Sequence, residues 1–323
     1  MLYTKDVKMK SSIITEVNNM WDKIQIFGPV ALWKPGIIII SLAIALLYYL
    51  FTGPLKHKAG LKEAPSRKQK TMFYIAVILF YAIKGSPLYL LSHIVLMAHM
   101  FQMAVFYFII PILVIKGIPE LWWRKVFNVK ILGNILRFIT KPLIAILVFN
   151  SAFSLYHMPF VLDFSKTNLF IHWAITLWIF FASMCMWWPL LTPIKEQDTM
   201  RPLLKILYIF GNGLLITPAC ALIIFASNPL YATYSQPDAF MKALELCVPA
   251  DVLQGMNLGG PQIFLNMPLV YDQQAAGILM KVLQEVIFGI VLASVFFKWF
   301  RSENKGNDPI PAHLHETNVP QYE

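Results

Sequence analysis

The sequence has few charged residues. Asp, Glu, Lys and Arg make up 14% of the 323 residues, whereas hydrophobic residues make up 58%. A water-soluble chain of this composition would have too few polar side chains to cover its surface. The scarcity of charge therefore excludes a soluble globular class and predicts an integral membrane protein.

Cysteines and catalytic motifs are also scarce. The three cysteines, Cys185, Cys220 and Cys247, have no paired spacing, which excludes a disulfide framework and a zinc motif. No GxSxG, HExxH or P-loop pattern occurs, so we expect no enzyme. The first 34 residues are polar, and no small-residue cleavage site follows the first apolar run, so we expect no cleaved signal peptide.

Long apolar runs dominate the rest of the chain. A membrane-spanning helix needs about 20 apolar residues, and we count seven candidates. They predict an all-α, polytopic bundle of seven transmembrane helices within residues 35–301, preceded by an extracytoplasmic segment, 1–34, and followed by a polar cytoplasmic tail, 302–323. The expected spans are 35–52, 70–90, 91–115, 141–160, 168–191, 203–226 and 272–299, with a tight turn at 85–87 and one long outer loop at 227–271. Within that loop, 238–247 has helical spacing with Phe240, Leu244 and Cys247 on one side.

The basic residues predict the orientation in the membrane. The first, third and fifth loops and the C-terminus carry most of the Lys and Arg, whereas the alternate loops hold only Lys84, Lys166 and Lys242. Because basic loops stay in the cytoplasm, we expect the N-terminus outside and the C-terminus inside. Five lysines before residue 35 favour the opposite orientation, but the first loop is much denser in charge. The net charge of +10 is then explained without nucleic acid.

One short stretch gathers the candidate ligands. Residues 92–103 contain two histidines and three methionines within an apolar run. At about 100° per residue, His93 and Met100 share one helical stripe, and His99 and Met103 share a second. Imidazole and thioether are ligands that suit Cu(I). Methionine is also an ordinary packing residue, whereas ionisable groups at membrane depth are costly and tend to be functional.

Other helices bring similar groups to the same depth. With the predicted orientation, His157 with Met158, His172, and the entrance Asp272-Gln273-Gln274 with Met280 all fall in the outer half of the bundle. They indicate a convergent site. Other interpretations stay open: the histidines can bond loop carbonyls, Asp272 can cap the seventh helix, and the glutamines can cap or bond across helices.

Two opposite charges lie deeper in the seventh span. Lys281 and Glu285 are four residues apart, so they can pair with one another. We expect this pair on the bundle interior, either as a structural ion pair or as a polar path below the site.

Several of these motifs resemble the CtaG family of assembly factors for caa-type cytochrome c oxidases. The resemblance covers residues 70–300. It rests on His99-Met100-Phe101-Gln102 with Pro111 and Gly117-Ile118-Pro119, on His157 with Pro159, on His172 ahead of Trp187-Trp188-Pro189, and on the run from Asp272 to Met280. The chain departs from the family pattern at Met103 and Thr176, where many members have histidine, and at Lys281, where relatives have tryptophan.

The resemblance implies a seven-helix protein of the bacterial cell membrane that assembles an active oxidase, with oxidase subunits as partners. Together with the ligand types, it implies Cu(I) binding and delivery, with an extracytoplasmic copper donor as a further partner. The candidate metal ligands are His93, His99, Met100, Met103, His157, His172 and Met280, and the residues expected to support them are Gln102, Met158, Asp272, Gln273 and Gln274. Two alternatives remain, a haem-handling protein with two axial histidines and a cofactor-free scaffold for oxidase subunits.

Overall fold

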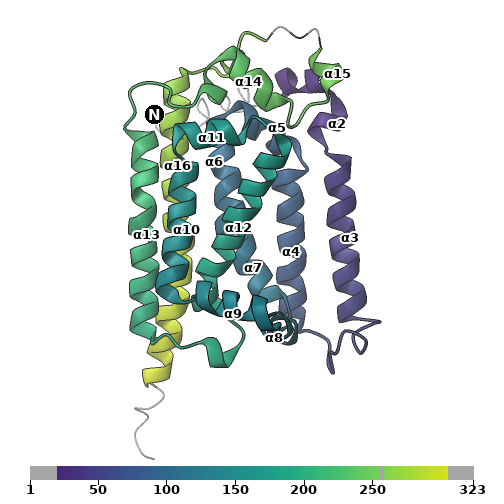
Figure 1. Cartoon of the computed structure of the whole chain (residues 1–323), viewed down its shortest axis with the longest axis vertical. Helices are drawn as coiled ribbons and strands as arrows, with labels where there is room; N and C mark the ends of the chain where they lie inside the picture. Colours follow the sequence, from purple (N-terminus) through teal and green to yellow (C-terminus); the bar gives the residue numbers. More distant parts are fainter. Residues whose placement is uncertain (1–19, 255, 257, 305–323) are drawn as a thin grey trace, which may run out of the picture.

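The computed structural model describes residues 20–254, 256 and 258–304, and within them every regular element is helical (Figure 1). Five helical runs are long and apolar enough to cross a membrane, and seven if each of two bent helix pairs forms one span. The five are α3 (Pro35–Thr52), the run Leu96–Gly117, α12 (Leu169–Leu191), α13 (Pro202–Ile224) and α16 (Leu269–Asn304). The structure is thus that of an all-α protein with several candidate membrane spans.

The predicted boundary between the second and third spans is wrong. Helix α4 (Arg67–Lys84) is followed by a separate short helix, α5 (Pro87–Ile94), bent by 48° from it. Proline at the first helical position and the Ser86 hydroxyl, which accepts a bond from the Leu88 N–H at 3.2 Å, start α5 as a new helix. Val95 then adopts an extended conformation, with φ −118° and ψ 123°. The third span therefore begins at Leu96, as α6 (Leu96–Ala104), a π-helical stretch (Val105–Ile109) and α7 (Ile110–Gly117).

The fourth predicted span, 141–160, corresponds to a shorter helix. Helix α10 (Pro142–Tyr156) ends before His157, and α11 (Pro159–Ser165) begins anew at a proline. Two short helices, α8 (Glu120–Phe127) and α9 (Lys130–Ile139), precede α10, and α9 is bent by 82° from it. The fifth, sixth and seventh predicted spans agree with α12, α13 and α16 to within a few residues, although α16 continues to Asn304.

One end of the bundle is covered by a cap, and we refer to it as the capped end (Figure 1). The described part of the cap consists of residues 20–32, including α2 (Gly28–Leu32), and residues 225–254, 256 and 258–268, including α14 (Pro237–Leu244) and α15 (Ala250–Leu253). Phe27, Phe240 and Leu244 are buried in one apolar cluster with Leu90 of α5. The helix predicted at 238–247 is confirmed up to Leu244, where α14 ends; Cys247 lies in the turn that follows and is buried in the same cluster. Residues 1–19 of the predicted N-terminal segment and the polar tail after Asn304 lie outside the described residues.

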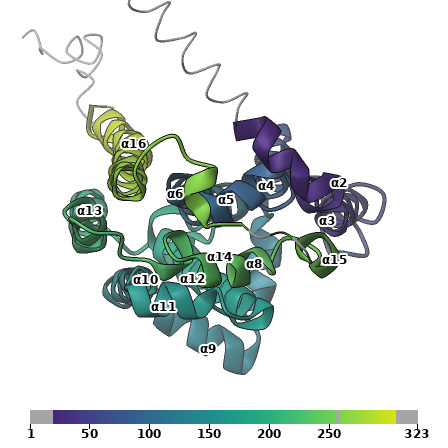
Figure 2. The ribbon, with the colours of Figure 1, turned by 90° about the horizontal axis from the view of Figure 1, so that it is seen from above.

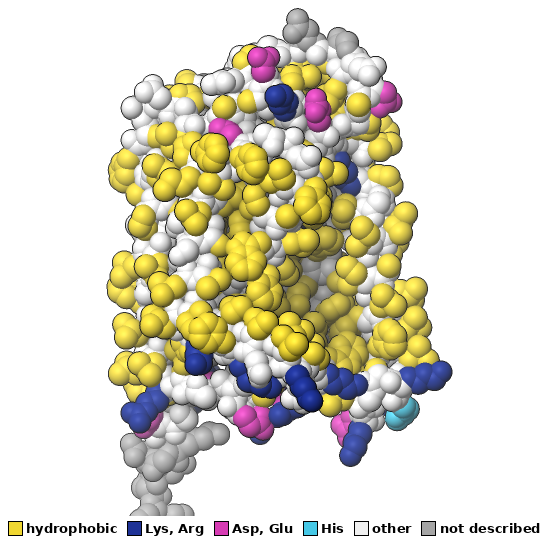
Figure 3. All heavy atoms as spheres, in the orientation of Figure 1, with side chains coloured by type: hydrophobic (Ala, Val, Ile, Leu, Met, Phe, Trp, Pro, Cys, Tyr) yellow, Lys and Arg dark blue, Asp and Glu magenta, His cyan; other side chains and the backbone are white. Residues whose placement is uncertain are grey.

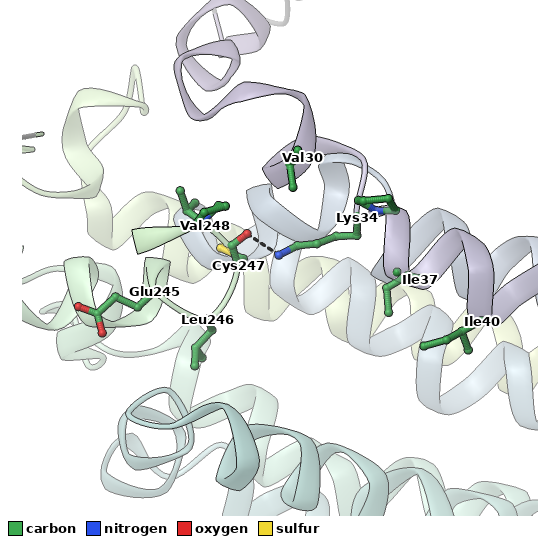
Figure 4. A pocket seen from close by; sticks show the side chains of 11 residues that line it. Val30, Lys34, Ile37, Ile40, Glu245, Leu246, Cys247 and Val248 are labelled. Atoms are coloured by element: carbon green, nitrogen blue, oxygen red, sulfur yellow. Dashed lines mark hydrogen bonds between the residues drawn. The ribbon is translucent and has the colours of Figure 1, made fainter. Parts of the chain in front are cut away.

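The cap also bonds to the residue directly before α3, the first candidate membrane span. The Lys34 ammonium, directly before α3, donates a hydrogen bond to the Cys247 carbonyl of the cap (Figure 4). The open pocket beside this bond is lined by Val30, Ile37 and Leu246 among others, and no histidine lines it. Further along α3, the Tyr48 hydroxyl donates to the Gly117 carbonyl at 2.8 Å.

The surface is divided into two regions. In the view of Figure 3, hydrophobic side chains form a broad band, and most of the visible Lys and Arg gather at the end opposite the cap. Seen from above, α13 and α16 stand beside one another at an edge of the bundle away from α3 (Figure 2). The main apolar core lies between α6, α7, α10, α12, α13 and α16.

Candidate functional site

Four histidines are buried near the capped end, and two of them share one arrangement. The Nδ1 atom of His93, in the last turn of α5, lies 2.9 Å from the Tyr89 carbonyl, and Nδ1 of His157, after α10, lies 2.7 Å from the Phe153 carbonyl. Because a carbonyl only accepts, Nδ1 carries the proton in both rings and Nε2 presents a bare lone pair. Both Nε2 atoms are buried without a hydrogen-bond partner among the described residues. Metal-binding histidines are commonly oriented in this way.

The third histidine, His99, lies against two tyrosines, Tyr156 and Tyr234. His99 lies in the first turns of α6, and its Nε2 atom is 3.3 Å from the Tyr156 hydroxyl, while its Nδ1 atom has no described partner. The Tyr156 ring also contacts His157, with centroids 5.5 Å apart. The ring of Tyr234, from the cap, also lies near His99, at 6.0 Å between centroids, and its hydroxyl donates to the Ser92 carbonyl at 2.6 Å.

His172 completes the group from the first turn of α12. Its ring centroid lies 5.7 Å from that of His93, and its Nδ1 atom is buried without a described partner. The structure thus brings together histidines from α5, α6, α10 and α12, which we call the histidine cluster: His93, His99, His157 and His172. Each ring has one buried nitrogen with no partner, and a buried polar atom without a partner is energetically costly.

Two buried lysines accompany the cluster, and the sequence analysis missed both. Lys84 is 4% exposed, donates to Gln102 Oε1 at 3.2 Å and lies over the rings of Tyr89, Phe106 and Trp173. Lys166, between α11 and α12, is 2% exposed, and its Nζ atom has no described partner. Burial lowers the pKa of Lys166 from 10.5 to about 7. The signal was present in the sequence, since each is the lone lysine between two long apolar runs.

The carboxylate of Asp272 bonds to another helix, α6, rather than capping its own helix, α16. Its carboxylate accepts hydrogen bonds from the backbone N–H groups of Leu96, at 2.8 Å, and Met97, at 3.3 Å. It therefore caps α6 from across the bundle, at the point where the backbone restarts after Val95. Asp272 thereby positions the turn that carries His99.

The other residues expected to support the ligands have different surroundings. Gln102 donates to the Ile83 carbonyl at 2.5 Å and accepts from Lys84. Gln273 and Gln274 bond to the backbone after α13, at Leu230, Asn228 and Ala226. Met158 is 52% exposed. These glutamines thus hold helices together, and the supporting role of Met158 stays a prediction.

The three candidate thioethers are buried in the main core. Met100 and Met103 lie on α6 and Met280 on α16, two helices that pack against each other, and none is more than 4% exposed. Among the described residues, no group of three or more His, Cys, Asp or Glu lies close enough to hold a metal ion. A metal ion bound by two of these histidines would therefore need thioether ligands as well. Otherwise the rings would have to rearrange so that more of them reach the ion.

The charged pair of α16, Lys281 and Glu285, is partly exposed. Lys281 Nζ lies 2.6 Å from Glu285 Oε1 and also donates to the Thr217 hydroxyl and the Gly213 carbonyl of α13. The Lys281 side chain is 26% exposed and that of Glu285 is 58% exposed. The expectation that the pair lies on the bundle interior is therefore wrong for Glu285.

Helices that are apolar along their length, a polar cluster buried near one end and a cap over that end are typical of a polytopic helical membrane protein with an internal site. Comparison with known protein families identifies the family to which the chain belongs. The sequence profile of the cytochrome c oxidase caa3 assembly factor family (Caa3_CtaG) matches residues 46–302, and the chain belongs to this family. No curated protein and no solved structure matches the chain significantly.

Proposed function

We propose that this protein assembles a caa-type cytochrome c oxidase in the bacterial cell membrane by binding Cu(I) in the histidine cluster and delivering it to the oxidase. Its role is that of a copper chaperone rather than an enzyme. The cluster faces the extracytoplasmic side, with the basic end of Figure 3 in the cytoplasm, in agreement with the positive-inside rule. Family membership supports the assembly role.

The observation that carries the copper proposal is the set of unpartnered ring nitrogens. His93 and His157 each present a bare Nε2 in a buried, apolar environment, held by a carbonyl on the other nitrogen. Soft ligands and a low-dielectric setting favour a monovalent, thiophilic ion. The residues that would hold Cu(I) are drawn from the four histidines and from Met100, Met103 and Met280. Copper would supply no chemistry here beyond being cargo.

The capped end also offers a route for the ion. A pocket between α11 and α14 is lined by Asp163, Asp238 and Lys166. Lys166 Nζ lies 5.8 Å from the centroid of the Tyr234 ring, which in turn contacts His99. We propose that an extracytoplasmic donor releases copper into this pocket and that the ion passes Lys166 and Tyr234 to reach the histidines.

The test is the copper content of the purified protein after reconstitution with Cu(I) under reducing conditions. We expect near-stoichiometric copper in the native chain, a loss of at least about tenfold in affinity for the double variant His93→Ala/His157→Ala, and reduced oxidase maturation in cells. His57→Ala is the matched control, since His57 is exposed in the first loop.

Two other outcomes would overturn the copper proposal. A Soret band in the purified sample, lost in the double variant, would replace copper with haem. Absence of copper and haem in every sample, with normal oxidase maturation in the double variant, would reduce the protein to a cofactor-free scaffold.

A further inference from the structure

The membrane face of α16 carries a charged group where a lipid-facing helix should have none. Gly213, whose carbonyl accepts from Lys281, is the middle residue of α13 (Pro202–Ile224). Glu285 lies about 24 Å along α16 from Leu269 at 1.5 Å per residue, so it falls near the centre of the span. At this depth a carboxylate cannot reach water or head groups by extending its side chain.

The surroundings of Glu285 are those of a surface in contact with lipid. The exposed residues of α16 that flank it, Val282, Val286 and Ile290, are 52%, 53% and 66% exposed. Gly289, one turn further along, has open space where a side chain would be, so another helix can approach closely. Among the exposed residues within 278–290, Glu285 is therefore the single charged one, and the others are Ile278, Val282, Val286, Gly289 and Ile290.

The hydrogen bonds around Lys281 and Glu285 indicate which kind of group this surface can still bind. The Lys281 ammonium already donates to Gly213, Thr217 and Gln284 and forms an ion pair with Glu285. An ionised carboxylate accepts up to about four bonds and donates none, and Lys281 is the one described partner of Glu285. The unmet capacity at the surface is therefore for hydrogen-bond donors.

A second copy of the chain does not provide them. Copies inserted in the same direction would pair this face around a two-fold axis along the membrane normal. Glu285 of one copy would then meet Glu285 of the other at the same depth, which places like charges together in a low dielectric. Charge complementarity instead favours a different helix.

We propose that the face formed by Val282, Glu285, Val286, Gly289 and Ile290 docks a transmembrane helix of another protein, one that carries a hydrogen-bond donor at mid-membrane depth. Glu285 accepts the bond from the donor, and Gly289 permits close approach of the two backbones. That this helix belongs to the oxidase under assembly rests on the proposed function, whereas the docking chemistry does not.

The first experiment uses the full-length protein in phospholipid vesicles with labelled Leu-rich transmembrane peptides. One peptide has a single central Asn and its control has Leu there, and association is measured by energy transfer at peptide dilutions that prevent self-association. We expect the Asn peptide to bind about 5- to 30-fold more tightly than the Leu peptide, as for other polar contacts between membrane helices. Glu285→Leu should abolish this preference, and Ile290→Leu on the same face should keep it.

Folding and self-association are checked in the same samples. Glu285→Gln, which keeps an acceptor oxygen, should retain part of the preference and distinguishes loss of the contact from misfolding. Equal binding of both peptides, or a preference that survives Glu285→Leu, would overturn the proposal. Energy transfer between two labelled copies of the chain that depends on Glu285 would overturn it in favour of a homodimer.

A second experiment identifies the partner. A photo-crosslinking residue replaces Val282 or Val286 in membranes that are assembling the oxidase, with Leu42 on the exposed face of α3 as the control position. Crosslinks from the α16 positions to an oxidase membrane subunit, absent from position 42 and lost with Glu285→Leu, support the full proposal. A peptide preference without these crosslinks would keep the docking chemistry and refute the oxidase as its partner.

Discussion

Removal of the Asp272 carboxylate should uncap α6 and disturb the histidine cluster. Asp272 is 3% exposed and Leu96 is 1% exposed, so water does not replace the two backbone bonds that the carboxylate accepts. Leaving a buried N–H without a partner costs about 1–3 kcal/mol, and loss of a helix cap costs about 0.5–2 kcal/mol. For the two groups together we expect Asp272→Ala to destabilise the protein by about 2–4 kcal/mol.

The conservative variant sharpens the test. Asp272→Asn keeps one acceptor oxygen and loses the charge, so it should cost about half as much, about 1–2 kcal/mol. Asp238 lies exposed in the first turn of α14, and Asp238→Ala should change stability by less than about 0.5 kcal/mol. Thermal or chemical unfolding in one detergent compares the four proteins.

Amide hydrogen exchange shows which part of the chain loses stability in Asp272→Ala. The amides of Leu96 and Met97 should exchange faster in Asp272→Ala, and the effect should extend to His99, because its N–H bonds to the Val95 carbonyl at the same break. Cu(I) affinity should fall with it. Unchanged unfolding and unchanged protection at Leu96 and Met97 would show that Asp272 does not hold this turn.

Two further predictions concern Lys166 and Gly117. The folded-state pKa of Lys166, about 7, is below its ordinary 10.5. The unfolded chain thus binds more protons between these values, and native stability should rise by about 1.4 kcal/mol per pH unit across this window. Lys166→Met should remove that slope in metal-free protein, and an unchanged slope would contradict the burial argument. A side chain at Gly117 would meet the Phe73 backbone nitrogen at 2.8 Å. Gly117→Ala should therefore lower stability by about 1–3 kcal/mol, whereas Gly36→Ala, where nothing lies within 4 Å, should not.

The sequence was sufficient for features that depend on neighbouring residues. Apolar length predicts α3, α12 and α13 to within two residues and α16 to within five, since a helix of about 20 apolar residues is the stable solution in hydrocarbon. The spacing within 238–247 predicts α14. Chemical type alone predicts that His93, His99, His157 and His172 are unusual, and all four are buried.

Features that depend on distant residues required the tertiary structure. The helix break at Val95 is compatible with an apolar run, and what stabilises it is a carboxylate 176 residues away. Burial of Lys84 and Lys166 depends on how the loops fold back over the cluster. Whether Glu285 faces the interior or the lipid depends on the order of the helices around the bundle, and helical periodicity is the same for every order. Local chemistry thus determines which residues are unusual, and the packing of helices far apart in the chain decides which of them meet.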